Sequence, residues 1–475
     1  MILWIRWFNC LKTLRPAFAR TRTFYWFTLV LMAMTVRTEH AGVTSFVRCL
    51  GFNEASYYRF LHFFHSSGVF LKDLQRLWVA LSLRLFKKFL VTVNGKFVFV
   101  CDGIKVGKEG KKMPGVKRLF QSSDNNSKPE YIDGHSCQAI SLLVQSASGS
   151  FTVPWINEIH EGADLTERAQ QRSLIDKLIQ MISKLKLNLP FYLVADAFYA
   201  NRRAALPLIQ AGNHLISLMR KNSVAYEYHS LYEYKNRTNR KRGRPRSYGR
   251  KIKLKDLFNE QELFAAAASP VPGDRNIQIR YRVVDLYWRP MGPRKVRFIL
   301  SDHPSRGRII LLSTDLELHA LAAIRLYSLR FRIELGFKQL IYTVGGFAYH
   351  FWMKPMKRRN RFEKEKPDLA TEPQKYRSNI RRKIRAYELY LQCAVIAQGL
   401  LQFLSMAFPR GVWACFGSWL RTMNPDQHPS EQVTAQALRN SLPEFLKVMK
   451  KYKNIEKFMS NWRPPPNLRE FRSTA

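Results

Sequence analysis

The chain has 475 residues, of which 46% are hydrophobic, and its 78 Lys and Arg against 35 Asp and Glu give a formal net charge of +43 at pH 7. The length and the hydrophobic content predict a globular protein of several domains and exclude an intrinsically disordered chain. Because so large an excess of one sign repels itself, and because the basic residues are spread along the whole chain, we expect a polyanionic partner such as a nucleic acid.

The cysteines and the apolar runs indicate which further classes of protein the chain does not belong to. The six cysteines lie far apart and no CxxC pair occurs, so neither a zinc site nor a disulfide framework is predicted, and a reducing compartment fits. Residues 24–36 are apolar but too short to span a bilayer. Residues 389–408 are long enough, but Gln392, Gln398 and Gln402 interrupt them. We therefore expect a buried packing helix there and no membrane contact.

Residues 1–94 are predicted to form a helical DNA-binding region. Within them, GVTSFVRCLGFNEASYYRFLHFF is typical of two short helices around a turn at Gly51 and Phe52. The second helix would present Tyr57 and Arg59. A helix-turn-helix would place that helix in a major groove. An ordinary helical hairpin gives the same pattern, and the sequence leaves both interpretations open.

Residues 95–222 alternate between strand and helix patterns. The apolar run KFVFVCDGIKV carries Asp102, and a later apolar run, FYLVADAFYAN, carries Asp196. Two more strands are predicted within 135–159, and the period of 3.6 predicts a helix within 163–186. Three strands, a helix, a strand, a helix and a strand predict a mixed α/β sheet flanked by helices.

Residues 223–314 break this rhythm and are predicted to be a β-rich insertion that follows a basic linker. In the linker, GRPR resembles a minor-groove hook, in which Arg244 and Arg246 would follow a narrow A·T groove while proline keeps the backbone extended. Four residues form a short motif, and a solvated linker explains them equally well.

Residues 315–350 are predicted to contain one long helix, LELHALAAIRLYSLRFRIELGFKQLIY, which Thr314 or Asp315 would cap. The remaining residues, 351–475, are expected to be a helical C-terminal region and a candidate for self-association. In the long helix, Arg330, Glu334 and Lys338 are spaced by four and stack on one face, with Tyr327 one turn earlier. The alternative is a surface ladder of ion pairs, but such a ladder does not require the other faces of the helix to be apolar.

Three carboxylates, those of Asp102, Asp196 and Glu334, occur where secondary-structure propensity would not place them. Two strand aspartates and a helix glutamate can share two divalent cations, and hard carboxylate oxygens suit Mg²⁺, with Mn²⁺ as a substitute. Two such ions activate the attacking oxygen and stabilise the leaving oxygen of an in-line phosphoryl transfer. Without metal, like charges brought together would force one carboxylate to protonate. These three residues are therefore the candidate metal ligands and catalytic residues.

The order of these features resembles the DDE transposases of bacterial insertion sequences. An acid after a first strand (VCDGIKV) is followed by an acid after a later strand (LVADAFYAN), an inserted β region and a helix with Y-x2-R-x3-E. The stretch LLSTDLELHALAAIRLYSLRFRIELGFKQ is most similar to the branch with a Tyr, Arg, Glu, Lys signature. The resemblance extends from around residue 20 to residue 410.

The resemblance implies a ribonuclease H-like catalytic core in which Asp102, Asp196 and Glu334 bind the metal ions. It also implies that Tyr327 and Arg330 contact DNA phosphate near the scissile bond.

Two further implications of the resemblance concern single residues. The family places its lysine seven residues after the glutamate, where Ile341 stands here, whereas Lys338 stands four residues after it. Lys338 is nevertheless the candidate for this role. The family also inserts an aromatic residue of its β insertion against a flipped base, and Trp288 is the candidate; a packing tryptophan at a strand end is the alternative.

The expected function is that of a transposase. It would bind the terminal inverted repeats of its element, hydrolyse a phosphodiester and use the freed 3′-hydroxyl to attack a target duplex. It would act as a homodimer on DNA, in the bacterial cytoplasm and associated with the nucleoid. Three alternatives remain: a structure-selective nuclease on the same core, a DNA-binding protein that has lost catalysis, and a membrane protein built on residues 24–36 and 389–408.

Overall fold

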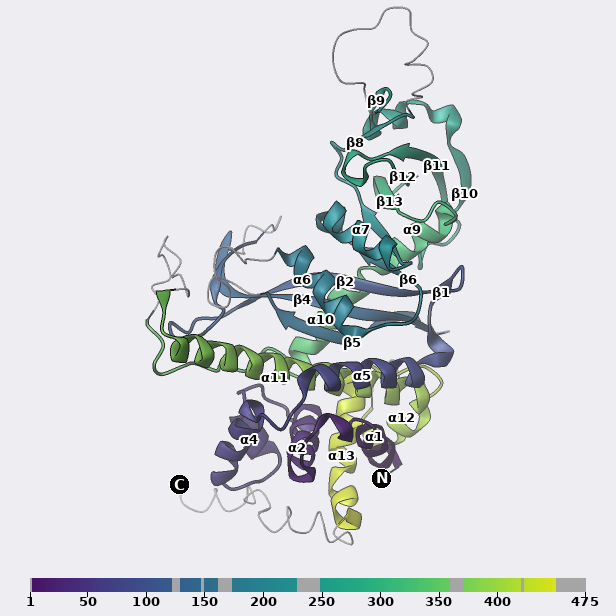
Figure 1. Ribbon diagram of the computed structural model, residues 1–475. Coiled ribbons are helices and arrows are strands. Elements are labelled where there is room, and N and C mark those ends of the chain that lie inside the picture. The colour runs from purple at the N-terminus through teal and green to yellow at the C-terminus, as the bar shows by residue number, and fades with distance from the viewer. Residues whose placement is uncertain are drawn as a thin grey trace, which may run out of the picture.

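A wide β-sheet runs through the middle of the molecule, with a helical bundle on one side and a β-rich lobe on the other (Figure 1). The computed structural model describes residues 2–121, 129–146, 149–160, 173–228, 248–358, 371–419 and 423–449.

The helices come before, within and after the sheet in chain order. They are α1 (Ile2–Lys12), α2 (Thr21–Val36), α3 (Thr44–Cys49), α4 (Ala55–His65), α5 (Leu71–Leu85), α6 (Leu174–Leu185), α7 (Arg202–Gln210), α9 (Ala320–Leu329), α10 (Arg332–Tyr342), α11 (Gln374–Ala407), α12 (Pro409–Phe416) and α13 (Glu431–Met449). The first five confirm the predicted helical character of the N-terminal region. The predicted helix within 163–186 is described from Ser173 onward, where a capping box begins α6.

The strands belong to one sheet that extends into the β-rich lobe. They are β1 (Thr92–Val93), β2 (Lys96–Gly107), β3 (Lys117–Phe120), β4 (Tyr131–Ser146), β5 (Gly149–Ile159), β6 (Phe191–Ala195), β7 (His214–Leu218), β8 (Val224–Tyr226), β9 (Lys251–Lys253), β10 (Ala265–Ala268), β11 (Gln278–Tyr287), β12 (Lys295–His303) and β13 (Gly307–Ser313).

The central part of the sheet has the order β5-β4-β2-β6-β7. Strands β2, β4 and β5 are antiparallel neighbours, whereas β6 and β7 continue from β2 in parallel. A helix precedes each of the two parallel strands, as the connections between parallel strands require. This arrangement confirms the mixed α/β sheet and the ribonuclease H-like fold that the resemblance implied.

The β-rich insertion is joined directly to the central sheet. Strand β13 pairs antiparallel with β7, and β12, β11, β8 and β9 follow it in order, with β10 on β11. The lobe therefore extends the edge of the catalytic sheet (Figure 1). Arg244 and Arg246, the residues of the predicted minor-groove hook, lie outside the described residues.

Helix α11 is the structural centre of the C-terminal region. It packs along β5 and contacts helices α2, α4, α5 and α13. The three glutamines that interrupt its apolar sequence are buried, and each donates a side-chain hydrogen bond to a backbone carbonyl, of Trp155, Gly336 or Thr152. Among the described helices, α11 alone is long and apolar enough to cross a membrane, and 94% of that window is buried inside the protein. The expected packing helix is thus what the structure contains.

The long helix predicted between residues 316 and 342 is divided. Helix α9 ends at Leu329 and α10 begins at Arg332, and between them the backbone N–H groups of Arg330 and Ile333 bond to carbonyls three residues earlier. The prediction of a cap at Thr314 or Asp315 was also wrong, because α9 begins later and His319 accepts the capping hydrogen bond from the N–H of Leu321. Apolar periodicity continues through such a break, so the sequence pattern did not reveal it.

Candidate active site

Asp102 and Asp196 lie on neighbouring parallel strands and face the same side of the sheet. Val100 of β2 is in register with Val194 of β6, and each aspartate follows two residues later. Because side chains alternate along a strand, both aspartates share a face with these valines. The valines belong to the core that α9 and the first turn of α10 cover, through residues such as Ile333. The fold therefore places both carboxylates beneath the helical segment that carries Glu334.

The backbone at each aspartate is fixed by a buried polar side chain from the adjacent strand. On β4, Gln138 donates to the carbonyl of Asp102 at 3.0 Å and accepts the hydroxyl hydrogen of Tyr199 at 2.6 Å. On β7, Ser217 donates to the carbonyl of Asp196 at 2.6 Å. Gln138 and Ser217 are completely buried. Sequence reasoning missed them, although a polar residue inside an apolar strand was the available signal.

Each of the two aspartates accepts a hydrogen bond from a nearby backbone N–H. Oδ1 of Asp102 accepts from the N–H of Gly103 at 2.7 Å, and Oδ1 of Asp196 accepts from the N–H of Phe198 at 3.0 Å. The second of these bonds caps a short 3₁₀ turn at Ala197–Tyr199. Each aspartate therefore has one oxygen directed to its own backbone, and the fold fixes the orientation of both groups.

One guanidinium lies between two of the three candidate carboxylates. Nη1 of Arg330 is 2.7 Å from Oδ2 of Asp102, and Nη2 is 3.2 Å from Oε1 of Glu334. The Arg330 and Asp102 side chains are both 17% exposed, whereas Glu334 is 44% exposed. The predicted stacking of Arg330 and Glu334 is present across the break between α9 and α10. The sequence did not reveal that Arg330 would pair with the strand aspartate.

The site carries more negative charge than the protein neutralises. The pKa of Asp102 is raised to about 6, chiefly by burial and also by the charges of Asp196 and Glu334, against the opposing effects of Arg330 and the N–H of Gly103. Three carboxylates and one guanidinium leave a deficit of two positive charges. A divalent cation, or a proton on one of the acids, is what such a site lacks.

The chemistry of the three carboxylates suits divalent metal ions. Carboxylate oxygens are the ligands that Mg²⁺ and Mn²⁺ prefer, and the raised pKa of Asp102 indicates charge that a cation would relieve. Within the described ranges, no three His, Cys, Asp or Glu side chains lie close enough together to hold a metal ion as they stand. Arg330 occupies the space between Asp102 and Glu334 instead. The chemistry therefore fits, provided that the guanidinium moves from the carboxylates.

The other residues of the predicted signature line the same helical segment. Tyr327 is half-buried, and the guanidinium of Arg330 lies 5.9 Å from the centre of its ring. Lys338 is exposed one turn beyond Glu334 on α10. Ile341, at the position where the family has its lysine, is half-buried. Lys338 is therefore the cation on this helix that remains accessible near the site.

The predicted DNA contacts of the N-terminal region lie away from this edge, on α4. Arg59 is exposed and Tyr57 is half-buried, while the neighbouring Tyr58 is 73% exposed. Helices α3 and α4 flank the turn at Gly51, as expected for the helix pair. In the β-rich insertion, Trp288 is only 8% exposed and belongs to the apolar core. The packing alternative for Trp288 thus agrees with the structure.

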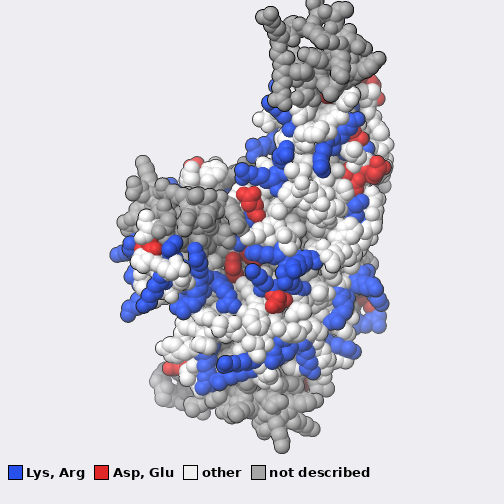
Figure 2. Space-filling view, viewed as in Figure 1, with Lys and Arg blue, Asp and Glu red and all other residues white. Residues whose placement is uncertain are grey.

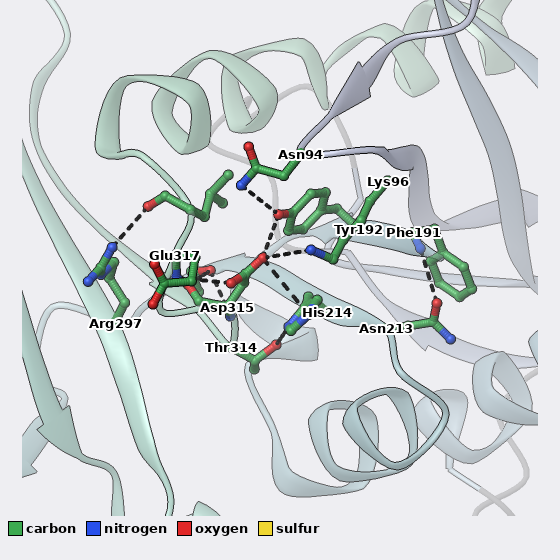
Figure 3. Close-up of polar contacts among 12 residues, drawn as sticks. Asn94, Lys96, Phe191, Tyr192, Asn213, His214, Arg297, Thr314, Asp315 and Glu317 are labelled. Atoms are coloured by element: carbon green, nitrogen blue, oxygen red, sulfur yellow. Dashed lines mark hydrogen bonds and ion pairs between the residues drawn. The ribbon is translucent and has the colours of Figure 1, made fainter. Parts of the chain in front are cut away.

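A second polar cluster anchors the helical segment of the site to the sheet (Figure 3). Asp315, which follows β13 and precedes α9, accepts from the Tyr192 hydroxyl at 2.5 Å and from Nζ of Lys96 at 3.3 Å, and His214 lies 3.9 Å away. Its other oxygen accepts from the N–H of Glu317 at 2.9 Å. The donors come from β2, β6 and β7, so one carboxylate ties the approach to α9 to the strands that carry Asp102 and Asp196.

The chain matches known protein families and is similar to a solved structure. Residues 13–270 match the family described as DDE superfamily endonuclease, and residues 158–387 match the family described as transposase DDE domain. No curated protein matches the chain. Among solved structures, the chain is similar to a piggyBac transposase in a cryo-EM synaptic complex with hairpin DNA, with 11% identity and a TM-score of 0.35 over 93% of this chain and 76% of that one.

The order of the strands and the acidic edge define a ribonuclease H-like protein. The first family match spans more than half of the sequence, and the chain belongs to the DDE superfamily endonucleases. The resemblance found in the sequence is thereby confirmed at the level of the family, and the protein is an enzyme of the nuclease and transposase class.

Proposed function

We propose that the protein is a transposase that cleaves and joins DNA at the ends of an insertion sequence. The proposal is supported by one observation in a chain of the DDE family: Arg330 pairs with both Asp102 and Glu334, and the register of β2 and β6 puts Asp196 beside Asp102. A site that served only stability would neutralise its acids internally, and this one does not.

Asp102, Asp196 and Glu334 would hold the cofactor, which we propose to be two Mg²⁺ ions, with Mn²⁺ as a substitute. When bound, the ions would activate the attacking oxygen and stabilise the leaving oxygen of an in-line phosphoryl transfer. The buried partners Gln138 and Ser217 hold the two aspartates in register. Each carboxylate can therefore act from a fixed position, as efficient positioning of ligands requires.

Arg330 has a distinct part in the proposal. Its guanidinium now bridges two carboxylates, and the same planar group suits the oxygens of a phosphate. With the carboxylates neutralised, Arg330 would bind the phosphate next to the scissile bond, with Tyr327 beside it. Lys338 would contact the same strand from the exposed side of α10.

The substrates of the proposed reaction are the terminal inverted repeats of the element and a target duplex. The net charge of +43 supports a polyanionic partner. Tyr57 and Arg59 on α4, and Arg244 and Arg246 in the basic linker, are proposed as further DNA contacts. Bringing two ends together calls for a homodimer on DNA, and we propose that the protein acts in the bacterial cytoplasm at the nucleoid.

The proposal is tested by incubating the protein with candidate element ends, Mg²⁺ and a target plasmid, and sequencing the products. Wild-type protein should cut at the ends and join the freed 3′-ends to the target. Asp102→Asn should lower cleavage by at least about a thousandfold, since it removes a ligand of the metal chemistry, and should retain DNA binding in a band shift. Cleavage by Asp102→Asn at the wild-type rate would remove Asp102 from the mechanism. Cleavage without joining would identify a nuclease.

A further inference from the structure

A cation-rich lobe forms where the N-terminal part of α11 meets two loops. We define the basic lobe by its exposed cations from three segments of the chain, which are Lys111, Lys354, Lys357, Arg358, Lys375, Arg381 and Arg382. Figure 2 shows Lys and Arg gathered on the side of the molecule to which the start of α11 extends in Figure 1.

The basic lobe is an ordered part of the fold with a small core of its own. Met353, Met356, Ile380 and Ile384 pack together in it and are almost completely buried. Backbone and side-chain hydrogen bonds join its segments: the N–H of Met353 donates to the carbonyl of Lys112 at 2.9 Å, and Nζ of Lys112 donates to the carbonyl of Lys354 at 3.1 Å. The cations are therefore held in a fixed arrangement and are not carried on a free tail.

Within the part of the chain that the structure describes, one of these cations forms an ion pair. Lys357 pairs with Glu372 at 2.6 Å, and Nη2 of Arg382 donates to the side-chain amide oxygen of Asn379 at 3.0 Å. Among the described residues, no carboxylate forms an ion pair with Lys111, Lys354, Lys375, Arg381 or Arg382. A surface selected for solubility alone mixes both signs, whereas a field of one sign attracts an opposite charge.

Lys375 lies in the first turn of α11, where a cation does not stabilise the helix. The first turn of α11 contains no acidic residue, although acids are favoured at this end of a helix and cations are disfavoured there. Arg382 also lowers the pKa of the neighbouring Lys383, after the larger effect of burial. These charges repel one another and would be stabilised by an external anion.

The basic lobe adjoins the strand that carries the first candidate catalytic aspartate. Strand β2 continues from Asp102 to Gly107, and the next residue, Lys108, is buried and donates from Nζ to the carbonyls of Phe347 and Tyr349 just before the lobe. Five residues of extended chain cover about 17 Å, which equals about five base pairs of duplex at 3.4 Å per pair. The strand that carries Asp102 therefore leads directly to the segments that form the lobe.

We propose that the basic lobe binds the phosphate backbone of the duplex that is being cut. The inference rests on the proposed function and adds a surface that lies outside the carboxylate site. Trp352, which is 60% exposed within the lobe, would lie against the sugar-phosphate backbone. Lys354 and Lys357 follow Trp352 closely in the same segment of the chain.

The test compares two double variants of equal charge. Arg381→Gln with Arg382→Gln removes two cations of the lobe, and Lys87→Gln with Lys88→Gln removes two exposed cations beside β1, at the opposite end of the sheet. The affinity for a labelled element end is measured in band shifts between 0.05 and about 0.3 M KCl, since each lost phosphate contact lowers the salt slope by about 0.9. The lobe variant should lose about two units of slope, which corresponds to about 50-fold weaker binding near 0.1 M salt. The control should match the wild type.

Two further measurements keep folding and binding apart. Thermal unfolding of both variants should match the wild type, and if the arginine variant unfolds early, Lys111→Gln with Lys354→Gln replaces it. Tryptophan fluorescence should fall when duplex is added, and Trp352→Phe should remove most of that change. Equal affinities and salt slopes for the lobe variant and the control would overturn the inference and leave the proposed function intact. Failure of the wild type to bind or cut any end would instead overturn the proposed function.

Discussion

Two acidic clusters on the same sheet differ in how far basic side chains neutralise them. Glu158 on β5 is 3% exposed, and Oε2 lies 2.9 Å from Nζ of Lys177 and 3.1 Å from Nζ of Lys184. Gln75 adds a hydrogen bond, and Glu388 approaches Lys177 at 3.9 Å. In this cluster two acids meet two lysines. At the candidate active site, three acids meet one arginine.

The pKa shifts record the same contrast. Burial would raise the pKa of Glu158, but the two lysines outweigh it and the net shift is downward. Burial raises the pKa of Asp102 to about 6, and one arginine does not reverse the effect. A carboxylate kept for stability is thus neutralised within the chain, whereas a carboxylate kept for chemistry retains charge for a ligand from outside.

The largest expected effect on stability comes from the neutralised cluster. Lys177→Met should destabilise the protein by about 3–5 kcal/mol, because it leaves Glu158 buried with a weaker set of partners. Lys184→Met is the matched control, and its effect should be smaller because Lys184 is more exposed. Urea unfolding measures both. At low temperature, where Lys177→Met is folded, its cleavage rate should equal that of the wild type. A lower cleavage rate in the folded variant would show that the Glu158 cluster also serves catalysis.

A smaller effect of opposite sign is expected at the candidate active site. Since folding raises the pKa of Asp102 from 3.8 to about 6, its contribution to stability is fully present below pH 4 and is lost as the pH rises through 6. Metal-free Asp102→Asn should therefore be more stable than the wild type at pH 8 by about 3 kcal/mol, with the gain absent at pH 4.

Asp315→Asn is the control with the reverse dependence on pH. Burial opposes ionisation of Asp315, but the Tyr192 hydroxyl, the N–H of Glu317, His214 and Lys96 together lower its pKa. Its stabilising contribution is present above the unfolded pKa and is lost as the pH falls through the folded value. Asp315→Asn should therefore be destabilised at pH 7, and less so near pH 3. If the change in unfolding free energy had the same pH dependence in Asp102→Asn and Asp315→Asn, the contrast between the two carboxylates would be contradicted.

The smallest effect is expected from the single cation of the candidate active site. Arg330→Gln should destabilise the metal-free protein by about 1–2 kcal/mol, because it removes the counter-charge of Asp102. Mn²⁺ should then raise the melting temperature of this variant more than that of the wild type, since no guanidinium has to leave the carboxylates. Arg330→Lys, which keeps a positive charge, should fall between them. An equal effect of Mn²⁺ on all three proteins would show that Arg330 does not compete with metal.

Much of the fold followed from the sequence because its strands are strongly apolar. The runs that carry Asp102 and Asp196 could be recognised as strands, and a parallel pair brings their ends together without further information. Partners that depend on tertiary packing could not be recognised in this way. The pairing of Glu158 could not be predicted, because its lysines lie on a separate helix, α6. The bond from Arg330 to Asp102 spans 228 residues and depends on the turn between α9 and α10.

Helix α11 links the two ends of the molecule in one rigid piece. It has 34 residues, so it is about 50 Å long, and its start lies in the basic lobe while its later turns run among α2, α5 and α13. Gly399 lets the indole of Trp78 lie directly on the helix backbone, where any larger residue would collide with it. A fragment that stops before this helix would expose the underside of the sheet, so the nuclease core should resist excision as a separate soluble piece. Attempts to trim the enzyme are better directed at its surface loops.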